Sequence, residues 1–379
     1  MITRRSAVSG LDVAAPPAKA RIDAAPAGGP KVAMVAASLE ILGGQGVQAS
    51  TLADRLRQDG CPVTFIPINP SFPPGLRRLR RVPFLRTAVN QALYLPSLRH
   101  LREADVAHVF SASYWSFLLS VVPAIRAARA SGKRTILNYH SGEAADHLAR
   151  WGPLVHPWLR RVDHIVVPSV FLRGVFARHG YEAQVIPNVV ELARFRHRER
   201  DPLGRRLLSV RNLEPHYRVE NTIDAFGILR SRHRDATLTI AGYGTQESRL
   251  RAMASGLGGA VRFRGRVERP EIPRLYEEHD VFLNSSVVDN QPISILEAFA
   301  AGLPVVSTGT GDISGMVRHG ETGLIVPASD PASMARAVET LWERPEAARA
   351  MARRAWQEAA HYTWPQVREK WLRVYGGRA

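Results

Sequence analysis

The sequence predicts an α/β fold in which parallel β-strands are covered by helices on both faces. Short apolar runs carry this prediction, because strands buried on both faces of a parallel sheet read as continuous hydrophobic segments. The clearest runs are Val281–Leu283, Pro304–Ser307 and Leu324–Val326. The chain has 379 residues, which is long enough for two domains that each bury a substantial core.

The composition is that of an ordinary globular protein, with 45% hydrophobic and 22% charged residues. The lone cysteine, Cys61, excludes internal disulfides and is compatible with a reducing compartment such as the cytoplasm. No apolar run approaches the roughly 20 residues that a membrane-spanning helix needs.

The formal net charge is +17, and nearly all basic residues are arginines; the only lysines are Lys19, Lys31, Lys133 and Lys370. Such a charge is compatible with nucleic acid, an anionic membrane or phosphorylated ligands. No helix-turn-helix, zinc-finger or aromatic RNA-binding signature accompanies the arginines, so nucleic acid is not predicted as a partner.

Residues 1–30 are rich in Ala, Pro and Gly without periodicity, and we predict a disordered extension. Lys31–Ser38 is then the first strand, and Gly43 and Gly44 lead into a helix that ends near Asp59. Free N–H groups at such a glycine turn and helix N-terminus can bind an anion. The alternative is that the glycines only permit a tight turn.

The rest of the first half continues to alternate strands and helices. Helices are expected over Phe117–Ala130 and, capped by Ser169, over Val170–Arg178. The charged segment Glu191–Gly204 marks the boundary between a first domain, residues 31–195, and a second, residues 196–360. Strands are expected at Val63–Ile66, Val106–Phe110, Arg134–Asn138, His164–Pro168 and Gln184–Ile186.

The segment Phe72–Arg102 differs from its surroundings, since arginine pairs are interleaved with Leu, Val and Phe and interrupted by prolines. This pattern predicts broken amphipathic helices on a surface. Two interpretations stay open: contact with an anionic membrane, or a solvated arginine face on a helix that packs on the core.

The second domain repeats the alternation and ends in helices over Asp330–Trp342, Pro345–Glu358 and the terminal stretch 361–379. Its additional strands are expected at Arg206–Val210, Thr237–Ala241 and Val261–Gly265.

One helix in this domain is well marked, because Ser294 occupies an N-cap position and Glu297 follows three residues later. Gly302 and Pro304 end it. The preceding loop lies at the carboxyl end of a strand, where ligands bind in parallel sheets. It contains Asp289, eight positions before Glu297.

The spacing from Asp289 to Glu297, the following Ala298–Val306 and the later Gly320-x-x-Gly323-Leu324 resemble the donor-site signature of the retaining GT-B glycosyltransferases, family 4. That family normally has Glu at both ends of the motif, whereas this chain has Asp at the first. The resemblance implies the GT-B fold: two facing Rossmann-like, doubly wound domains, with a C-terminal helix (361–379) that packs back on the first domain.

The resemblance also implies roles for single residues. Glu297 corresponds to the carboxylate that binds both ribose hydroxyls of a nucleotide sugar, and Asp289 to the one near the transferred sugar. The alternative for Glu297 is that it only completes a capping box with Ser294. His140 follows a strand end that faces the interdomain cleft, where family members commonly place a sugar-contacting histidine; with Asp289 it is our catalytic candidate.

The phosphate site departs from the family. Where members usually have Arg and Lys, this chain has Asn212 and Tyr217, while Arg211 and Arg218 lie one residue out of register. Amide and phenol groups cannot replace two cations without loss of charge. The predicted donor-binding residues are Gly43, Gly44, Arg211, Asn212, Tyr217, Arg218, Gly265, Val267, Asn290, Gln291, Ile293, Ser294 and Glu297.

A glycosidase is not predicted, because it needs two carboxylates that flank the bond and no second one has an evident position across the cleft. No metal-ligand motif is present, and no cofactor is expected. The expected reaction is retaining sugar transfer from a nucleotide-diphosphate sugar to a saccharide or lipid-linked acceptor in bacterial polysaccharide or glycolipid assembly, in the cytoplasm or at the inner membrane face. The alternative is a non-catalytic relative that serves as a sugar-binding or partner subunit of a biosynthetic complex.

Overall fold

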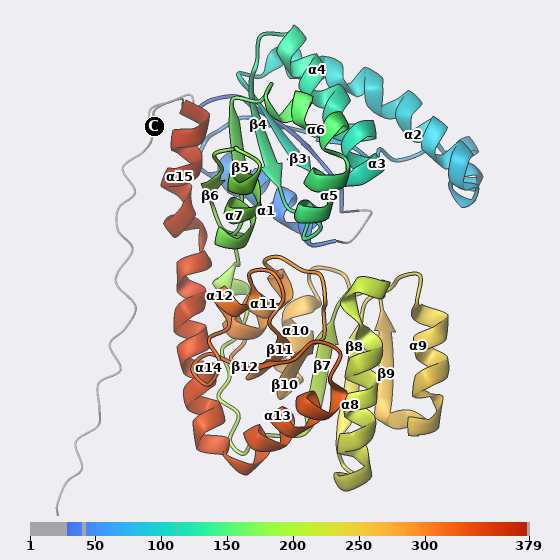
Figure 1. The fold of residues 1–379 in the computed structure, drawn as a ribbon, viewed down its shortest axis with the longest axis vertical. Coiled ribbons are helices and arrows are strands. Elements are labelled where there is room, and N and C mark those ends of the chain that lie inside the picture. The colour runs from blue at the N-terminus through green and yellow to red at the C-terminus, as the bar shows by residue number, and fades with distance from the viewer. Residues whose placement is uncertain (1–28, 40–42, 112, 377–379) are drawn as a thin grey trace, which may run out of the picture.

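The computed structural model describes residues 29–39, 43–111 and 113–376, so the extension predicted over residues 1–30 lies almost entirely outside the described ranges. Two six-stranded sheets, parallel throughout, form two facing domains (Figure 1). The first sheet, of the N-domain, contains β1 (Val32–Ala36), β2 (Val63–Pro67), β3 (Val106–Ser111), β4 (Arg134–Tyr139), β5 (His164–Val167) and β6 (Gln184–Val185). The second sheet, of the C-domain, contains β7 (Arg206–Val210), β8 (Thr237–Ala241), β9 (Val261–Gly265), β10 (Val281–Asn284), β11 (Val305–Thr308) and β12 (Leu324–Val326).

Both sheets are doubly wound. Their strand orders are β2-β1-β3-β4-β5-β6 and β12-β11-β10-β7-β8-β9, so the direction of winding reverses between β1 and β3 and between β7 and β10. Ligands bind outside the carboxyl ends of the strands at such switch points. The predicted fold class is therefore confirmed, and the loops after β1, β7 and β10 lie where a ligand is expected.

The helices of the N-domain cover both faces of its sheet. The predicted helix Phe117–Ala130 is confirmed only in part: helical structure begins at Tyr114 and passes through one π-helical turn. Pro123 in the next helix has no N–H to donate to the turn before it, which favours such a widened turn. The helices are α1 (Gly44–Gln58), η1 (Pro74–Arg81), α2 (Pro83–Ser97), η2 (Leu98–Glu103), α3 (Tyr114–Ser116), η3 (Phe117–Val121), α4 (Val122–Ala130), α5 (Ala144–Arg150), α6 (Gly152–Leu159) and α7 (Val170–Arg178). Ser169 caps α7 as predicted, its hydroxyl accepting a hydrogen bond from the N–H of Leu172.

In the C-domain the predicted capping box is wrong. Helix α11 begins at Ile293 with Pro292 as its N-cap, so Ser294 is already the second helical residue. The Ser294 hydroxyl is buried and has no hydrogen-bond partner. The remaining helices are η4 (Leu192–Arg194), η5 (Pro215–Tyr217), α8 (Val219–Arg232), α9 (Glu247–Ala254), η6 (Ser255–Ala260), α10 (Ile272–Glu277), α11 (Ile293–Ala300), α12 (Ile313–Met316), α13 (Pro331–Glu343), α14 (Pro345–Ala359), η7 (Ala360–Tyr362) and α15 (Trp364–Gly376).

The terminal helix returns to the N-domain, as predicted. Helices α14 and α15 form a column along one side of both domains (Figure 1). Trp371 and Tyr375 of α15 are buried with the strands of the N-domain sheet. The Tyr375 hydroxyl is 2.8 Å from Nδ1 of the buried His108 in β3. Large aromatic side chains that are buried in this way hold the helix against the N-domain.

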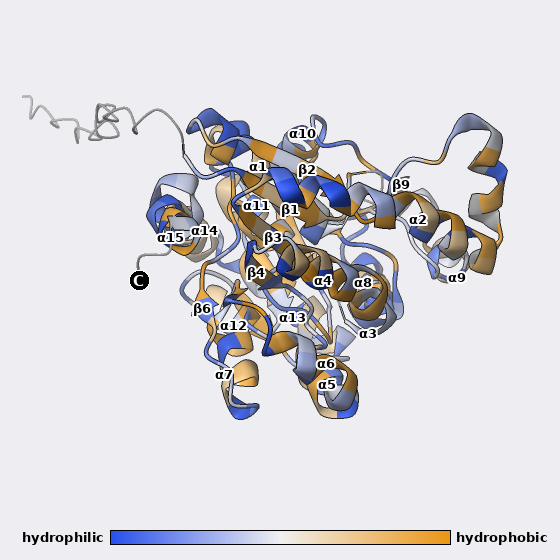
Figure 2. Ribbon diagram, turned by 90° about the horizontal axis from the view of Figure 1, so that it is seen from above, coloured by the Kyte–Doolittle hydropathy of each residue, from blue (hydrophilic) through white to orange (hydrophobic). Residues whose placement is uncertain are grey.

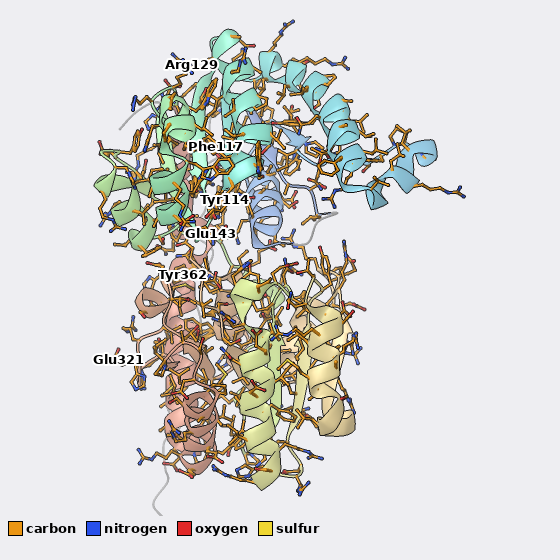
Figure 3. All side chains as sticks on the ribbon, turned by 45° about the vertical axis from the view of Figure 1, so that its right-hand side comes forward. Tyr114, Phe117, Arg129, Glu143, Glu321 and Tyr362 are labelled. Carbon is orange, nitrogen blue, oxygen red and sulfur yellow. The ribbon has the colours of Figure 1, made fainter. Side chains whose placement is uncertain are left out.

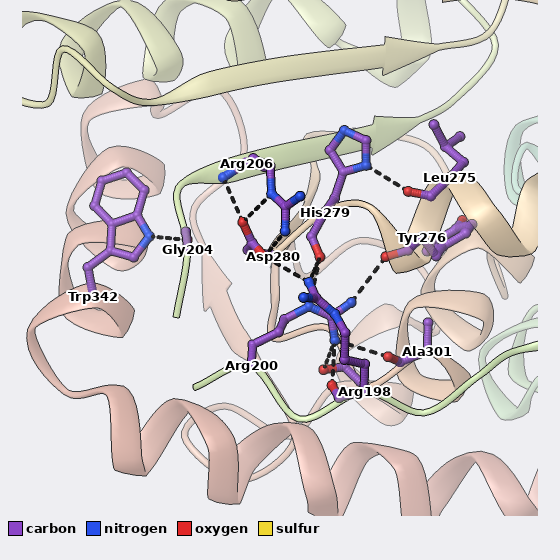
Figure 4. Close-up of polar contacts among 11 residues, drawn as sticks. Arg198, Arg200, Gly204, Arg206, Leu275, Tyr276, His279, Asp280, Ala301 and Trp342 are labelled. Carbon is purple, nitrogen blue, oxygen red and sulfur yellow. Dashed lines mark hydrogen bonds and ion pairs between the residues drawn. The ribbon is translucent and has the colours of Figure 1, made fainter. Parts of the chain in front are cut away.

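The linker between the domains is fixed to the C-domain by Arg200 (Figure 4). This side chain is 3% exposed, and its guanidinium donates only to backbone carbonyls at the ends of helices α10 and α11 and in the linker itself. The last turn of a helix leaves carbonyls without intrahelical partners, and Arg200 bonds the chain at two such helix ends. Beside it, Asp280 pairs with Arg198 and Arg206 at 2.9 Å each. The start of the linker-side strand β7 and the end of α11 are thereby held together.

Elements η1 and α2 form an arm that projects from the N-domain (Figures 1 and 2). Broken helices were predicted here, and they are found. Several large apolar side chains of the arm face solvent, among them Phe84 (88% exposed), Leu85 (48%) and Val82 (45%). Among the described residues, no helix combines the length and apolarity needed to cross a bilayer.

Candidate functional site

Two joined pockets lie between the domains, at the carboxyl ends of both sheets. We call them the Glu297 pocket and the Asp289 pocket after the acidic residue that lines each. Gly43, Gly44, Arg211, Tyr217 and Ile293 line both, so these five residues mark the junction. Asn212, Val267, Ser294 and Glu297 line the first, and His140, Asp289, Asn290 and Gln291 line the second.

Two predicted donor-binding residues lie outside both pockets. Arg218 has a left-handed backbone (φ 48°), and its half-exposed side chain pairs with Glu220 at 3.3 Å. Gly265 has φ 62°, which explains its glycine by the backbone alone. The sequence signal for these two positions therefore reflects the turns that begin α8 and end β9.

Glu297 lies one turn into α11 and receives a 2.9 Å hydrogen bond from the Tyr276 hydroxyl. Burial raises the pKa of Glu297 to about 7, although the Tyr276 hydrogen bond and nearby arginines act in the opposite direction. Ser294, one turn earlier on the same face, presents its unpartnered hydroxyl to this pocket. A carboxylate and a hydroxyl so placed can hold the two neighbouring hydroxyls of a ribose.

Asp289, unlike Glu297, is part of an ion pair. Its carboxylate pairs with the Arg211 guanidinium and accepts a 2.9 Å hydrogen bond from the N–H of Asn290. Both side chains of the ion pair are nearly buried, at 10% and 12% exposed. Arg211 also donates to Asn284 at 2.9 Å and lies 4.9 Å from the Tyr217 ring centre. The positive charge of Arg211 is therefore balanced by Asp289 at the junction of the pockets.

His140 follows β4, as predicted, and lines the Asp289 pocket. Its ring packs against Phe110 at 5.2 Å, and its Nε2 is buried without a hydrogen-bond partner. Burial lowers the pKa of His140 to about 3, so its imidazole is neutral at physiological pH. A neutral imidazole can donate one hydrogen bond to a sugar hydroxyl and accept another.

The backbone conformation at position 43 does not require a glycine. Its φ is −153°, and a Cβ at this position would meet nothing within 4 Å. Gly43 is the N-cap of α1, and with Gly44 it forms a side-chain-free wall shared by both pockets. The space is therefore open toward the pockets, which favours close approach of a ligand over the tight-turn alternative.

Asn290 and Gln291 join the domains. Asn290 Oδ1 accepts a hydrogen bond from the Ser169 hydroxyl of the N-domain. Gln291 is bonded twice to Asn188, which donates its N–H at 2.6 Å and its side-chain amide at 2.8 Å. Both side chains line the Asp289 pocket while their polar atoms bridge the two domains.

Several lining residues were missed by the sequence analysis. Glu143 lines the Asp289 pocket from the N-domain side, where Figure 3 labels it at the edge that faces the C-domain. The expectation that no second carboxylate lies across the cleft is therefore wrong. Glu143 follows His140 closely on the same loop, and that proximity was the available signal. His216 lines the same pocket, and in the sequence it lies between the predicted Asn212 and Tyr217.

Three arginines were also missed: Arg194, Arg266 and Arg269 line the Glu297 pocket. Arg266 and Arg269 flank the predicted Val267, but Arg194 comes from the linker, where no motif indicates a site. Arg269 donates to Thr51 of α1 at 2.9 Å and to Glu191 of the linker at 2.6 Å. It therefore ties this wall of the pocket to the N-domain.

Within the described ranges, no group of three or more His, Cys, Asp or Glu side chains is arranged to hold a metal ion.

Known proteins match both halves of the chain. Residues 42–194 match the model described as glycosyltransferase family 4, and residues 204–344 match that described as glycosyl transferases group 1. Glycogen synthase of Mycobacterium tuberculosis (strain H37Rv) is 31% identical over 290 residues, which are 74% of this chain and 68% of that protein. Phosphatidyl-myo-inositol mannosyltransferase of Mycobacterium leprae is 27% identical over 73% of this chain and 72% of its own length.

Among solved structures, Anabaena HepE in complex with UDP-glucose superimposes with a TM-score of 0.71 at 16% identity, covering 92% of this chain and 100% of that one. This likeness shows a common fold.

Proposed function

Because the chain belongs to the group 1 glycosyltransferases of family 4, we propose that it transfers a sugar from a nucleotide-diphosphate donor to a saccharide or lipid-linked acceptor. The observation that carries the proposal is the pair of joined pockets at the switch points of both sheets. One holds a partly buried carboxyl beside an unpartnered hydroxyl, and the other holds a neutral histidine beside an ion pair.

In this proposal the two pockets divide the donor. The ribose hydroxyls bind Glu297 and Ser294, and the base lies against the apolar wall that includes Val210 and Val267. The diphosphate occupies the junction, where the N–H groups at the start of α1 and the Arg211 guanidinium face it. The sugar enters the Asp289 pocket, within reach of His140 and Asp289.

Uridine is the base to test first, because the HepE structure contains UDP-glucose. We include guanosine and adenosine, since backbone groups near Val267 would read the base and this chain has its own arginines there.

We propose retention of the anomeric configuration and no need for a metal. The leaving diphosphate would take the proton of the attacking hydroxyl, while the protein positions the reactants and stabilises the developing charge. Glu143, on the N-domain side of the pocket, is placed to hold an acceptor hydroxyl. Proton NMR of the early product should show the anomeric configuration of the donor, and an inverted product would contradict retention. The rate should be unchanged in EDTA, and loss of activity with EDTA would contradict metal independence.

The acceptor side of the proposal rests on the arm. The mannosyltransferase relative is named for a lipid acceptor, and the arm exposes Phe84 and Leu85 among arginines. We propose bacterial polysaccharide or glycolipid assembly at the inner face of the membrane, with the arm against anionic lipid.

Liposome co-sedimentation tests the arm. Replacing Arg77, Arg78, Arg80 and Arg81 with Gln should release the protein from anionic vesicles at low salt, since each basic residue contributes about 1 kcal/mol near such a surface. Phe84→Ser should weaken binding as well. If the wild-type protein stays in solution with anionic vesicles at low salt, the membrane part of the proposal is wrong.

Thermal denaturation with a panel of uridine, guanosine and adenosine diphosphates and their sugars tests the activity. One base class should raise the melting temperature, because ligand at a hundred times its Kd adds about 2.7 kcal/mol of stability. Slow hydrolysis of the matching nucleotide sugar should follow without acceptor. A folded sample that responds to no nucleotide would instead favour a non-catalytic relative.

A further inference from the structure

The proposed donor brings a diphosphate to the junction of the pockets, and few cations are available there. Arg211 is paired with Asp289, so its charge is already balanced. Arg218 turns away to Glu220 and lines neither pocket. The two arginines that the sequence offers for the diphosphate therefore supply little uncompensated charge.

The Asp289 pocket contains two more side chains that can become cationic. Among its described lining residues, Arg211, His140 and His216 are the basic ones. His140 is buried against Phe110, and its low pKa keeps it neutral. His216 is the remaining candidate.

The position of His216 is well defined. It is the middle residue of η5, the turn between β7 and α8 at a switch point of the C-domain sheet. Its carbonyl accepts hydrogen bonds from the N–H groups of Val287 at 2.9 Å and Val288 at 3.4 Å. These bonds attach η5 to the loop that carries Asp289.

The His216 ring lies 4.2 Å from the Tyr217 ring, and the Arg211 guanidinium lies 4.9 Å from the same ring. Arg211 and Tyr217 belong to the junction, whereas His216 lines the sugar side. The three side chains thus lead from the nucleoside side of the junction to the sugar side, along the path that a diphosphate would follow.

We propose that His216 is the second basic side chain of the diphosphate site, in place of a permanently charged residue. This inference rests on the proposed function. Its imidazole can donate a hydrogen bond to a phosphate oxygen.

The charged and titratable groups around His216 come from three segments. Arg211, Glu214 and Tyr217 belong to its own segment, and the Glu214 carboxylate is held by Thr245, with its Oε2 2.6 Å from the hydroxyl. Asp289 faces the pocket from the loop after β10, and His140 and Glu143 face it from the N-domain. Asp289 is occupied by Arg211, so Glu143 is the carboxylate of this pocket with no arginine partner among those described.

The test is calorimetric titration of wild type, His216→Gln and His216→Arg with the matching nucleoside and its diphosphate sugar, at pH 6 and pH 8. UDP-glucose and uridine are the first probes, since a diphosphate sugar has no phosphate group that titrates in this range. At pH 6, His216→Gln should bind the diphosphate sugar about tenfold more weakly, as expected for loss of one charge-assisted hydrogen bond. At both pH values His216→Arg should bind the diphosphate sugar more tightly than His216→Gln does.

The nucleoside serves as an internal control, because its affinity should be the same in all three proteins. His361→Gln, which changes an exposed histidine outside both pockets, is the matched control and should behave as wild type. Equal affinity of wild type and His216→Gln for the diphosphate sugar at pH 6 would overturn the inference and leave the proposed function intact. A loss with Arg218→Gln instead would assign the charge to Arg218, and wild type that binds no nucleotide sugar would contradict both proposals.

Discussion

The two pockets hold carboxylates in opposite states. Glu297 is buried without an ion-pair partner at hydrogen-bond distance, and its pKa is raised to about 7. Asp289, with 12% of its side chain exposed, is paired with Arg211. The difference indicates what each pocket can accept: one has a carboxyl ready for neutral hydroxyl donors, and the other has a charge pair that a ligand must share or displace. The predictions below test this contrast, from the largest expected effect to the smallest.

Arg211→Ala should have the largest effect. Removal of the guanidinium leaves Asp289 nearly buried without its cation, and breaking a buried pair in this way costs about 3–5 kcal/mol. Chemical denaturation should show this loss of unfolding free energy, and the double variant Arg211→Ala/Asp289→Asn should regain much of it. If the single variant is as stable as wild type, the pair is not the buried unit described here.

Glu297→Gln should change stability in the opposite direction. The pKa of this carboxyl is higher in the folded state than in the unfolded state. The free energy of unfolding therefore falls as the pH rises above the unfolded-state pKa, and the fall is complete above the folded-state pKa. With a folded pKa of about 7, the gain from Gln should reach up to about 3 kcal/mol at pH 8 and stay below about 1 kcal/mol at pH 5. Denaturation curves at both pH values measure it; a stability difference independent of pH would show that Glu297 does not titrate in this range.

The same pKa predicts how nucleoside binding depends on pH. Ribose hydroxyls donate to the ionised carboxylate, so the affinity of wild type should fall about tenfold between pH 8 and pH 6 as Glu297 takes up a proton. Titration with the nucleoside alone isolates this effect from the diphosphate. Glu297→Gln should bind weakly at both pH values, and a wild-type affinity that rises in acid would contradict the assignment.

Asp289→Asn should have the smallest effect on binding. The amide no longer neutralises Arg211, so the nucleoside diphosphate should bind roughly two- to tenfold more tightly while nucleoside affinity stays unchanged. Weaker binding of the diphosphate would mean that Asp289 positions Arg211 and does not compete with the ligand for it.

The sequence predicted the parts of this site that depend on strand order. Runs of buried apolar residues located the twelve strands of the described ranges within a few positions, and parallel strands bring their carboxyl ends to one edge. For that reason His140, Asp289 and Glu297, which follow strand ends in the sequence, line the two pockets.

Contacts between distant segments could not be predicted in the same way. Arg211 and Asp289 are 78 positions apart, and Asn188 and Gln291 are 103 apart. No local pattern indicates either pair. The Ser294 cap was wrong for a local reason, since Pro292 has a φ of −70° that allows the helix to begin earlier than the serine pattern indicates.

The most direct test of the divided donor site is one affinity series: nucleoside, nucleoside diphosphate and nucleotide sugar, each titrated into wild type and Glu297→Gln. The account predicts that Glu297→Gln weakens all three by a similar factor, of about 10- to 100-fold, because the lost charged hydrogen bond belongs to the ribose that they share. A loss seen only with the sugar-bearing ligand, or equal affinities in both proteins, would contradict the assignment of the Glu297 pocket to the nucleoside.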